Sequence, residues 1–84
     1  MSDEAGSRAG DVLAFLVKSV VSDPDAVRIE SEEKNGTVSL EVHVGDGDMG
    51  RVIGKRGRVA NAIRTVVSAA AAADDLRAEV DFAD

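Results

Sequence analysis

The stretch that decides the fold is Val52-Ile53-Gly54-Lys55-Arg56-Gly57-Arg58. Apolar spacing predicts a short helix that ends at Gly54 and a longer helix that begins after Gly57. A glycine at each end of this link permits positive φ and lets a second chain approach the backbone closely. The link also meets a helix N-terminus, where free N–H groups and the helix dipole attract phosphate. The stretch therefore predicts a clamp for a phosphate backbone.

Basic side chains gather around this link. Between Arg51 and Arg64 there are five basic residues and no acidic one, so these 14 residues carry a charge of +5. The other 70 residues carry 5 basic and 16 acidic groups, or −11, and the whole chain carries −6. A basic island on an acidic body offers phosphate one face and repels it elsewhere. The charge pattern alone leaves a second interpretation open, which is a merely solvated helix face.

We expect the clamp to act on single-stranded nucleic acid in two ways. The backbone and the mobile basic side chains of the link would hold phosphates. Bases would lie with their Watson–Crick edges in an apolar groove beside the link, walled by Val52, Ile53 and Val59. The candidate RNA-binding residues are Arg51, Val52, Ile53, Gly54, Lys55, Arg56, Gly57, Arg58, Val59, Asn61 and Arg64.

The chain around the link predicts one small domain. At 84 residues there is room for a single core, with a polar disordered tail over residues 1–9 and the folded domain over 10–84. Apolar residues recur at helical spacing from Asp11, which can cap a first helix, and Pro24 stands just past its end. The first helix is therefore expected to begin at Asp11.

Alternation of apolar and polar residues predicts strands within 27–30, 38–44 and 76–82. Asn35-Gly36, between the first two, is typical of a tight antiparallel hairpin. Asp48 is placed to cap the short helix before the link. In the longer helix after the link, the apolar stripe expected to face the core consists of Val59, Ile63, Val66 and Ala70.

The predicted order of elements is helix, strand, strand, short helix, longer helix, strand, or αββααβ. The last strand can pair parallel to the second through a right-handed crossover formed by the two later helices. The three helices then cover one face of a three-stranded mixed sheet. The expected fold class is a single two-layer α+β domain.

The stretch from Val52 to Ile63 matches the Val-Ile-Gly-x-x-Gly signature of the KH family, followed by an apolar-spaced helix. The order αββααβ resembles the bacterial, type II KH arrangement. The short chain, with Asp48-Met49-Gly50 leading into the signature, resembles the small stand-alone KhpA-type RNA-binding proteins. The resemblance covers about residues 10–82. One departure is Ala60, where many KH domains carry a bulky aliphatic residue.

The resemblance implies binding of single-stranded RNA without catalysis, as an RNA chaperone or post-transcriptional regulator. It also implies self-pairing into a homodimer and a larger partner protein of the KhpB (Jag) type. An alternative remains open from the residues themselves. A protein–protein adaptor or dimerisation module could use the same Val-Ile-Gly face, with weak RNA binding or none, and the acidic body favours this reading.

The residues give little support to other functions. No pair of side chains suggests acid–base catalysis, and His43, on the exposed side of its strand, has no second His or Cys for a metal. Gly45-x-Gly47-x-x-Gly50 matches a dinucleotide fingerprint, but the helix behind it ends at Gly54 and the chain is too short for the fold that uses it. We therefore expect no enzyme activity, no cofactor, no metal and no small-molecule substrate.

Two further absences bear on partners and location. The chain has no Trp or Tyr, and Phe15 and Phe82 stand at core-type positions, so no aromatic platform for base stacking is expected. No apolar run approaches the ~18 residues needed to cross a bilayer, and the polar, acidic start lacks the pattern of a signal peptide. A cytoplasmic location without membrane contact is expected.

Overall fold

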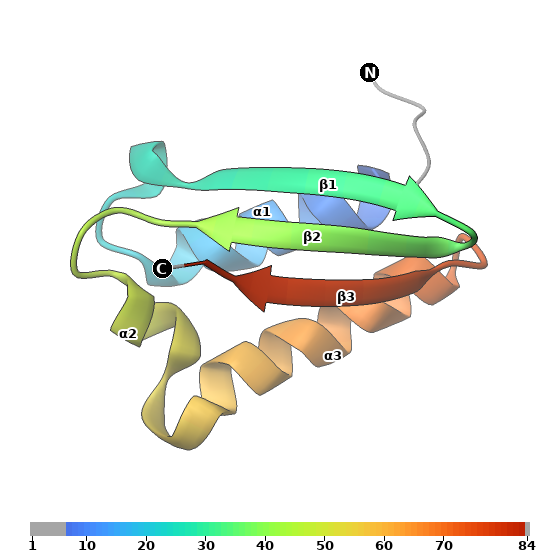
Figure 1. The fold of residues 1–84 in the computed structure, drawn as a ribbon. Coiled ribbons are helices and arrows are strands. Elements are labelled where there is room, and N and C mark those ends of the chain that lie inside the picture. The colour runs from blue at the N-terminus through green and yellow to red at the C-terminus, as the bar shows by residue number, and fades with distance from the viewer. Residues whose placement is uncertain (1–6, 84) are drawn as a thin grey trace.

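In the computed structural model, which describes residues 7–83, the chain forms a sheet with helices packed on one side of it (Figure 1). Six main elements follow one another in the predicted order αββααβ, with short 3₁₀ turns at Pro24–Ala26 and Lys55–Gly57. The main elements are α1 (Ser7–Val20), β1 (Arg28–Lys34), β2 (Thr37–His43), α2 (Met49–Ile53), α3 (Arg58–Ala72) and β3 (Arg77–Phe82).

The sheet has the strand order β1-β2-β3, with β1 antiparallel and β3 parallel to β2. Thr37 lies opposite Lys34 in β1 and opposite Arg77 in β3, which fixes the register on both sides. The parallel pairing follows from the crossover through α2 and α3, which brings the chain back to the end of the sheet where β2 begins, so that β3 runs beside β2 in the same direction. The three-stranded mixed sheet and the α+β class are therefore confirmed.

The hairpin between β1 and β2 turns at Asn35-Gly36, as predicted. Both residues have positive φ, 53° at Asn35 and 81° at Gly36. This pair of angles is typical of the tight turn whose twist matches that of the flanking strands, and Asn and Gly adopt it at least cost. The hairpin thus sets the register that puts alternate residues of β2 on the core side.

The core lies between the sheet and the helices. Alternation in β2 buries every second side chain, and helical spacing in α1 and α3 buries one stripe of each helix. Burying apolar area of this kind is the main favourable contribution to folding. The core cluster consists of Ala9, Leu13, Val17, Val38, Leu40, Val42, Val52, Ile63, Val67 and Ala71.

The first helix begins earlier than predicted, at Ser7 instead of Asp11. The reason is Ala9, which is fully buried and extends the stripe of Leu13 and Val17 by one turn at a spacing of four. Asp11 lies inside the helix and does not cap it. Of the expected disordered tail, residues 7–9 are helical, and residues 1–6 lie outside the described residues.

The stripe predicted to face the core in α3 was wrong in part. Ala60, Ile63, Val67 and Ala71 are buried, whereas 47% of Val66 is exposed. Phe15 of α1, also expected in the core, is 70% exposed. Both helices carry apolar residues around more than one face, so periodicity alone does not say which face turns inward. Within residues 7–83 no helix is long and apolar enough to cross a membrane.

Candidate nucleic-acid interface

The link between α2 and α3 has an unusual backbone. Three of its residues have positive φ, 76° at Gly54, 58° at Arg56 and 74° at Gly57. The Gly54 N–H donates to the carbonyl of Gly50 at 2.9 Å and closes α2, and the Gly57 N–H donates to the carbonyl of Gly54 at 3.1 Å. The link therefore turns tightly, and it leads directly into the N-terminus of α3, as the sequence predicts.

The two glycines of the link differ in what they require. A Cβ at Gly54 would stand 2.8 Å from the Cβ of Val59 and 2.9 Å from its backbone nitrogen, closer than atoms can pack. A Cβ at Gly57 would meet only the side-chain nitrogen of Asn61, at 4.0 Å. Gly54 is therefore needed for space and for its φ, whereas Gly57 is needed for its φ alone.

The five basic residues around the link divide into two groups. Lys55, Arg56 and Arg58 are exposed, and across residues 7–83 the structure pairs none of them with a carboxylate. Arg51 pairs with Asp48 at 3.3 Å. Arg64 donates from its Nε to the backbone carbonyl of Val80 at 3.2 Å. The tip of the link thus carries three unpaired cations, and the two flanking arginines are held in place.

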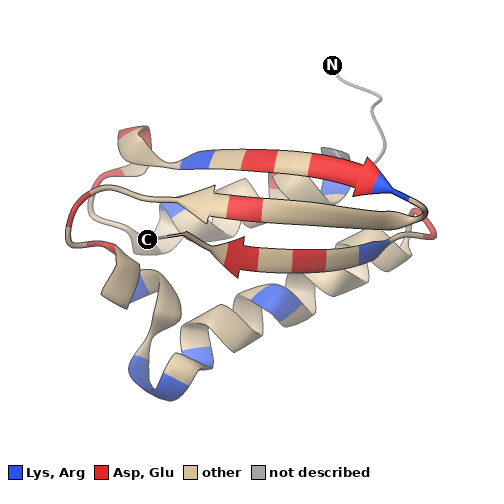
Figure 2. Cartoon of the chain, viewed as in Figure 1, with Lys and Arg blue, Asp and Glu red and all other residues tan. Residues whose placement is uncertain are grey.

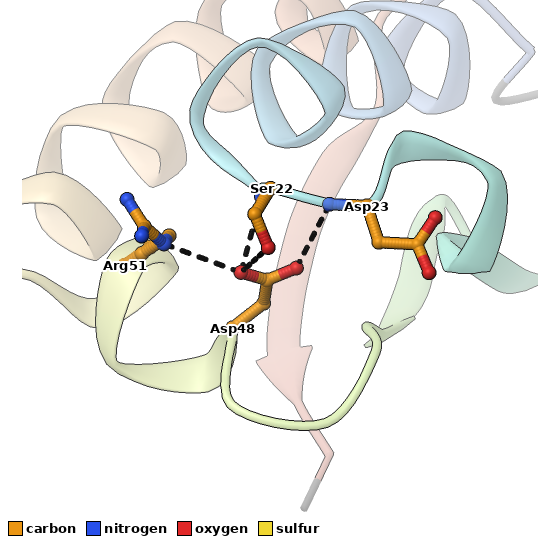
Figure 3. A network of polar contacts seen from close by, with 4 residues as sticks. All are labelled: Ser22, Asp23, Asp48 and Arg51. Carbon is orange, nitrogen blue, oxygen red and sulfur yellow. Dashed lines mark hydrogen bonds and ion pairs between the residues drawn. The ribbon is translucent and has the colours of Figure 1, made fainter.

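Asp48 is a residue whose role the sequence did not reveal. Its carboxylate is buried, with 1% of the residue exposed, and the side chain makes no capping bond to α2. Figure 3 shows it turned instead toward the chain after α1, where it accepts hydrogen bonds from the Ser22 N–H at 3.1 Å, the Ser22 hydroxyl at 2.8 Å and the Asp23 N–H at 3.1 Å. The backbone N–H of Ser22 is the main cause that holds the pKa of Asp48 below its ordinary value.

The expected role of Asp48 as a helix cap is therefore corrected. The N–H groups of Ser22 and Asp23 follow the end of α1, where the chain turns and offers them no helical acceptor. The carboxylate of Asp48 satisfies both, and the start of α2 is thereby fixed to the end of α1. No local pattern could indicate this, because the partners are 25 and 26 positions apart.

The apolar candidates do not come together as one groove wall. Val52 is fully buried in the core, so its side chain is closed to a ligand. Ile53 is partly exposed. Val59 turns to the other side, where it lines a hollow of about 360 Å³ between α1 and α3. The lining residues of this hollow are Leu16, Ser19, Val20, Arg58, Val59, Ala62, Ile63 and Val66.

The two exposed faces of α3 point in opposite directions. At 3.6 residues per turn, Asn61 and Arg64 follow Gly57 along one side of the helix, and Val59, Ala62 and Val66 lie half a turn away. Ala60 belongs to the buried face between them. The side of α3 that carries Asn61 and Arg64 is therefore distinct from the apolar hollow, and Arg58 lines the hollow where it reaches the link.

The basic and acidic parts of the surface are separated as the charge count predicts. Figure 2 shows Lys and Arg positions from the link along α3, whereas most of the charged positions on the strands are acidic. Glu41 of β2 lies directly between Glu30 of β1 and Asp81 of β3. His43 stands beside these carboxylates, 3.5 Å from Glu41 and 3.9 Å from Glu30. The group contains no Cys and no second His, and carboxylates that are exposed or half-buried do not by themselves indicate a metal.

Comparison with known proteins places these features in a family. A family model described as KhpA/KhpB, KH domain, matches residues 10–82. The chain is 40% identical over 73 residues to the RNA-binding protein KhpA of Caldanaerobacter subterraneus subsp. tengcongensis, covering 87% of this chain and 97% of that protein. It is 43% identical over 71 residues to the RNA-binding protein KhpA of Clostridium acetobutylicum, covering 84% and 95% respectively.

A third relative, the RNA-binding protein KhpA of Leifsonia xyli, is 44% identical over 72 residues, which cover 86% of this chain and 92% of that protein. The matched region contains the link, both helices beside it and the whole sheet. Family match, element order and mixed sheet agree with the single type II KH-like domain that the sequence predicts. This chain belongs to the KhpA/KhpB family of KH domains.

Proposed function

We propose that this protein binds short single-stranded RNA and holds its phosphates on the link Gly54–Gly57. The observation that carries the proposal is the tight, positive-φ link at the N-terminus of α3, surrounded by three cations that no carboxylate neutralises within residues 7–83. Relatives named as RNA-binding proteins over nearly the same length support it.

The chemistry of the proposed site is binding, not catalysis. Free N–H groups at the start of α3 and the helix dipole attract phosphate oxygens, and Lys55, Arg56 and Arg58 add mobile positive charge. Ile53, partly exposed at the end of α2, offers an apolar contact to a base. Arg51, Asn61 and Arg64 flank the path. We infer a role in the cytoplasm as an RNA chaperone or post-transcriptional regulator, without a metal, a cofactor or a small-molecule substrate.

Salt dependence of RNA binding tests the clamp. Each phosphate contact on a single strand contributes about −0.7 to the slope of log affinity against log salt, so three contacts predict a slope of about −2. We expect the double variant Lys55→Asp/Arg56→Asp to lose binding of a fluorescein-labelled, randomised RNA pool in fluorescence anisotropy. Arg28→Asp/Arg77→Asp makes the same charge change on the sheet and should bind normally. If both doubles bind alike, the link is not the clamp.

We propose in addition that the domain pairs with a second copy of itself through the apolar face between α1 and α3. Phe15 and Val66 stand exposed on the two helices that enclose the apolar hollow. A projecting side chain and a hollow on one face are what a two-fold interface needs, since each copy must supply both. A KhpB-type protein is the second partner we consider, because the matching family model groups KhpA and KhpB domains.

Light scattering coupled to size exclusion tests the pairing. Val66→Asp should give a monomer that still binds RNA, because Val66 lies on the opposite side of α3 from Asn61 and Arg64 and about two turns away from the link. Glu33→Ser, at an exposed position of β1, serves as the control. A wild-type chain that stays monomeric at high concentration rejects the homodimer and leaves the KhpB-type partner to be tested by titration.

A further inference from the structure

Arg64 is held in a fixed position on the surface by two contacts to the edge strand β3. Its Nε donates to the backbone carbonyl of Val80 at 3.2 Å. Its guanidinium carbon lies over the ring of Phe82, 5.1 Å from the ring centroid. A guanidinium is planar and is attracted to the face of an aromatic ring. The two contacts therefore fix both the position and the orientation of the Arg64 guanidinium.

The arrangement differs from that of the basic residues on the link. Lys55, Arg56 and Arg58 are exposed and unpaired, which suits phosphates whose positions vary along a flexible strand. Arg64 is also exposed, but its position is constrained. Across residues 7–83 it forms no ion pair, so no carboxylate neutralises its charge or covers its outer side. The guanidinium therefore presents an open face to solvent.

Arg64 lies on the path that leads away from the link. Asn61 and Arg64 stand four and seven residues after Gly57, on the same side of α3. The side-chain nitrogen of Asn61 is 4.0 Å from the place of a Cβ on Gly57, so this side chain points back to the link. At 1.5 Å per residue, Arg64 is about 10 Å further along the helix axis than Gly57. A strand held at the link and running along α3 meets Asn61 and then Arg64.

We propose that Arg64 stacks a nucleobase of the bound RNA on the face of its guanidinium that points away from Phe82. This inference rests on the proposed function and adds the position of a base to a site otherwise made of phosphate contacts. Arginine planes are among the surfaces on which bases of single-stranded RNA stack. The absence of Trp and Tyr from the chain is thereby offset, because Phe82 supports an arginine instead of receiving the base itself.

Phe82 was expected in the core, and no base-stacking platform was expected at all. Phe82 is only partly buried, and it packs against the core at its edge. The pair is formed by residues of α3 and β3 that are 18 positions apart, so it becomes visible only when the strand returns beside the helix.

Arg64→Lys separates stacking from charge, because lysine keeps the charge but lacks the plane. Two probes of equal length and charge are needed, fluorescein-labelled oligoadenylate of ten nucleotides and the same strand with abasic residues in place of the adenosines. We expect Arg64→Lys to weaken oligoadenylate binding about fivefold or more, with the salt slope unchanged and no effect on the abasic strand. The control is Arg77→Lys, an exposed arginine of β3 without a ring beneath it.

A second variant tests the support. Phe82→Leu keeps an apolar side chain at the sheet edge but removes the ring, and it should weaken oligoadenylate binding in the same direction. The double variant Arg64→Lys/Phe82→Leu should bind much as either single variant, since both changes remove one stacking site. Circular dichroism and thermal unfolding establish that each variant is folded.

The opposite results would overturn the proposal. Equal weakening on both strands would make Arg64 a phosphate contact, and no weakening on oligoadenylate would leave it without a role in base binding. Wild-type affinity that is equal for the two strands rejects base stacking altogether. The clamp is judged separately, on the abasic strand with Lys55→Asp/Arg56→Asp, so its failure is not confused with failure of the stacking site.

Discussion

The carboxylate of Asp48 accepts two hydrogen bonds from Ser22, one from its backbone N–H and one from its hydroxyl, across 26 positions of sequence. The same carboxylate pairs with Arg51, one turn before the link. Asp48 therefore joins the end of α1 to the start of α2, and through α2 it fixes where the link stands relative to the core. A residue without a predicted binding role thus holds the proposed binding site in place.

Asp48→Asn should destabilise the fold. An amide in place of the carboxylate cannot accept from Ser22 and Asp23 with both of its polar groups, so one of these partly buried donors loses its partner. We expect the melting temperature to fall by about 5 °C or more, as measured by circular dichroism. Asp46→Asn changes an exposed neighbour in the same loop and should have no such effect. Equal melting temperatures for the two variants would contradict the role of Asp48.

The Asp48 contribution should also depend on pH. Because the pKa of Asp48 in the folded state lies below its ordinary value of 3.8, folding favours the ionised form. The stabilisation is complete above the ordinary pKa and is lost as the pH falls toward the lowered pKa of the folded state. The melting temperatures of wild type and Asp48→Asn should therefore differ most near neutral pH and converge at low pH. A difference that stays constant down to low pH would mean that the charge of Asp48 is not what stabilises the fold.

Gly54 and Gly57 should respond differently to alanine. The methyl group added by Gly57→Ala has no close neighbour, so the only cost is the left-handed φ, which lowers the free energy of unfolding by about 1 kcal/mol. Gly54→Ala adds overlap with the backbone of Val59 to an unfavourable φ, so it should lower the free energy of unfolding by more than Gly57→Ala. Urea unfolding measures both, and RNA anisotropy should show the larger loss for Gly54→Ala. The reverse ranking would mean that the link relaxes around the added methyl group.

The features predicted best are those set by neighbours in sequence. Asn35-Gly36 specifies its turn, and two glycines with apolar flanks specify the link, because the backbone angles that these residues need are local. Alternation along β2 likewise placed Val38, Leu40 and Val42 on the core side. In such cases a few adjacent residues contain the whole physical cause.

The features missed have causes elsewhere in the molecule. Asp48 finds its partners 25 and 26 positions away, so only the folded chain reveals them. Val66 is as apolar as Val67, and which of them is buried depends on how α3 rotates against the sheet. Phe15 is exposed on a helix whose core face is already filled by smaller residues. The pairing of Arg64 with Phe82 likewise depends on the return of β3 beside α3.

The division of the cations leads to a last prediction, on the electrostatics of RNA binding. Neutralising an unpaired cation of the link, as in Lys55→Gln, Arg56→Gln or Arg58→Gln, should flatten the slope of log affinity against log salt by about 0.7 if that side chain contacts one phosphate. Arg51→Gln should flatten it less, because Asp48 already neutralises much of that charge at 3.3 Å. Anisotropy titrations at four salt concentrations measure the slopes, with Arg77→Gln as the control. If Arg51→Gln changes the slope as much as Arg56→Gln, Arg51 leaves Asp48 for the RNA, and Asp48 acts on the fold but not on the charge of the site.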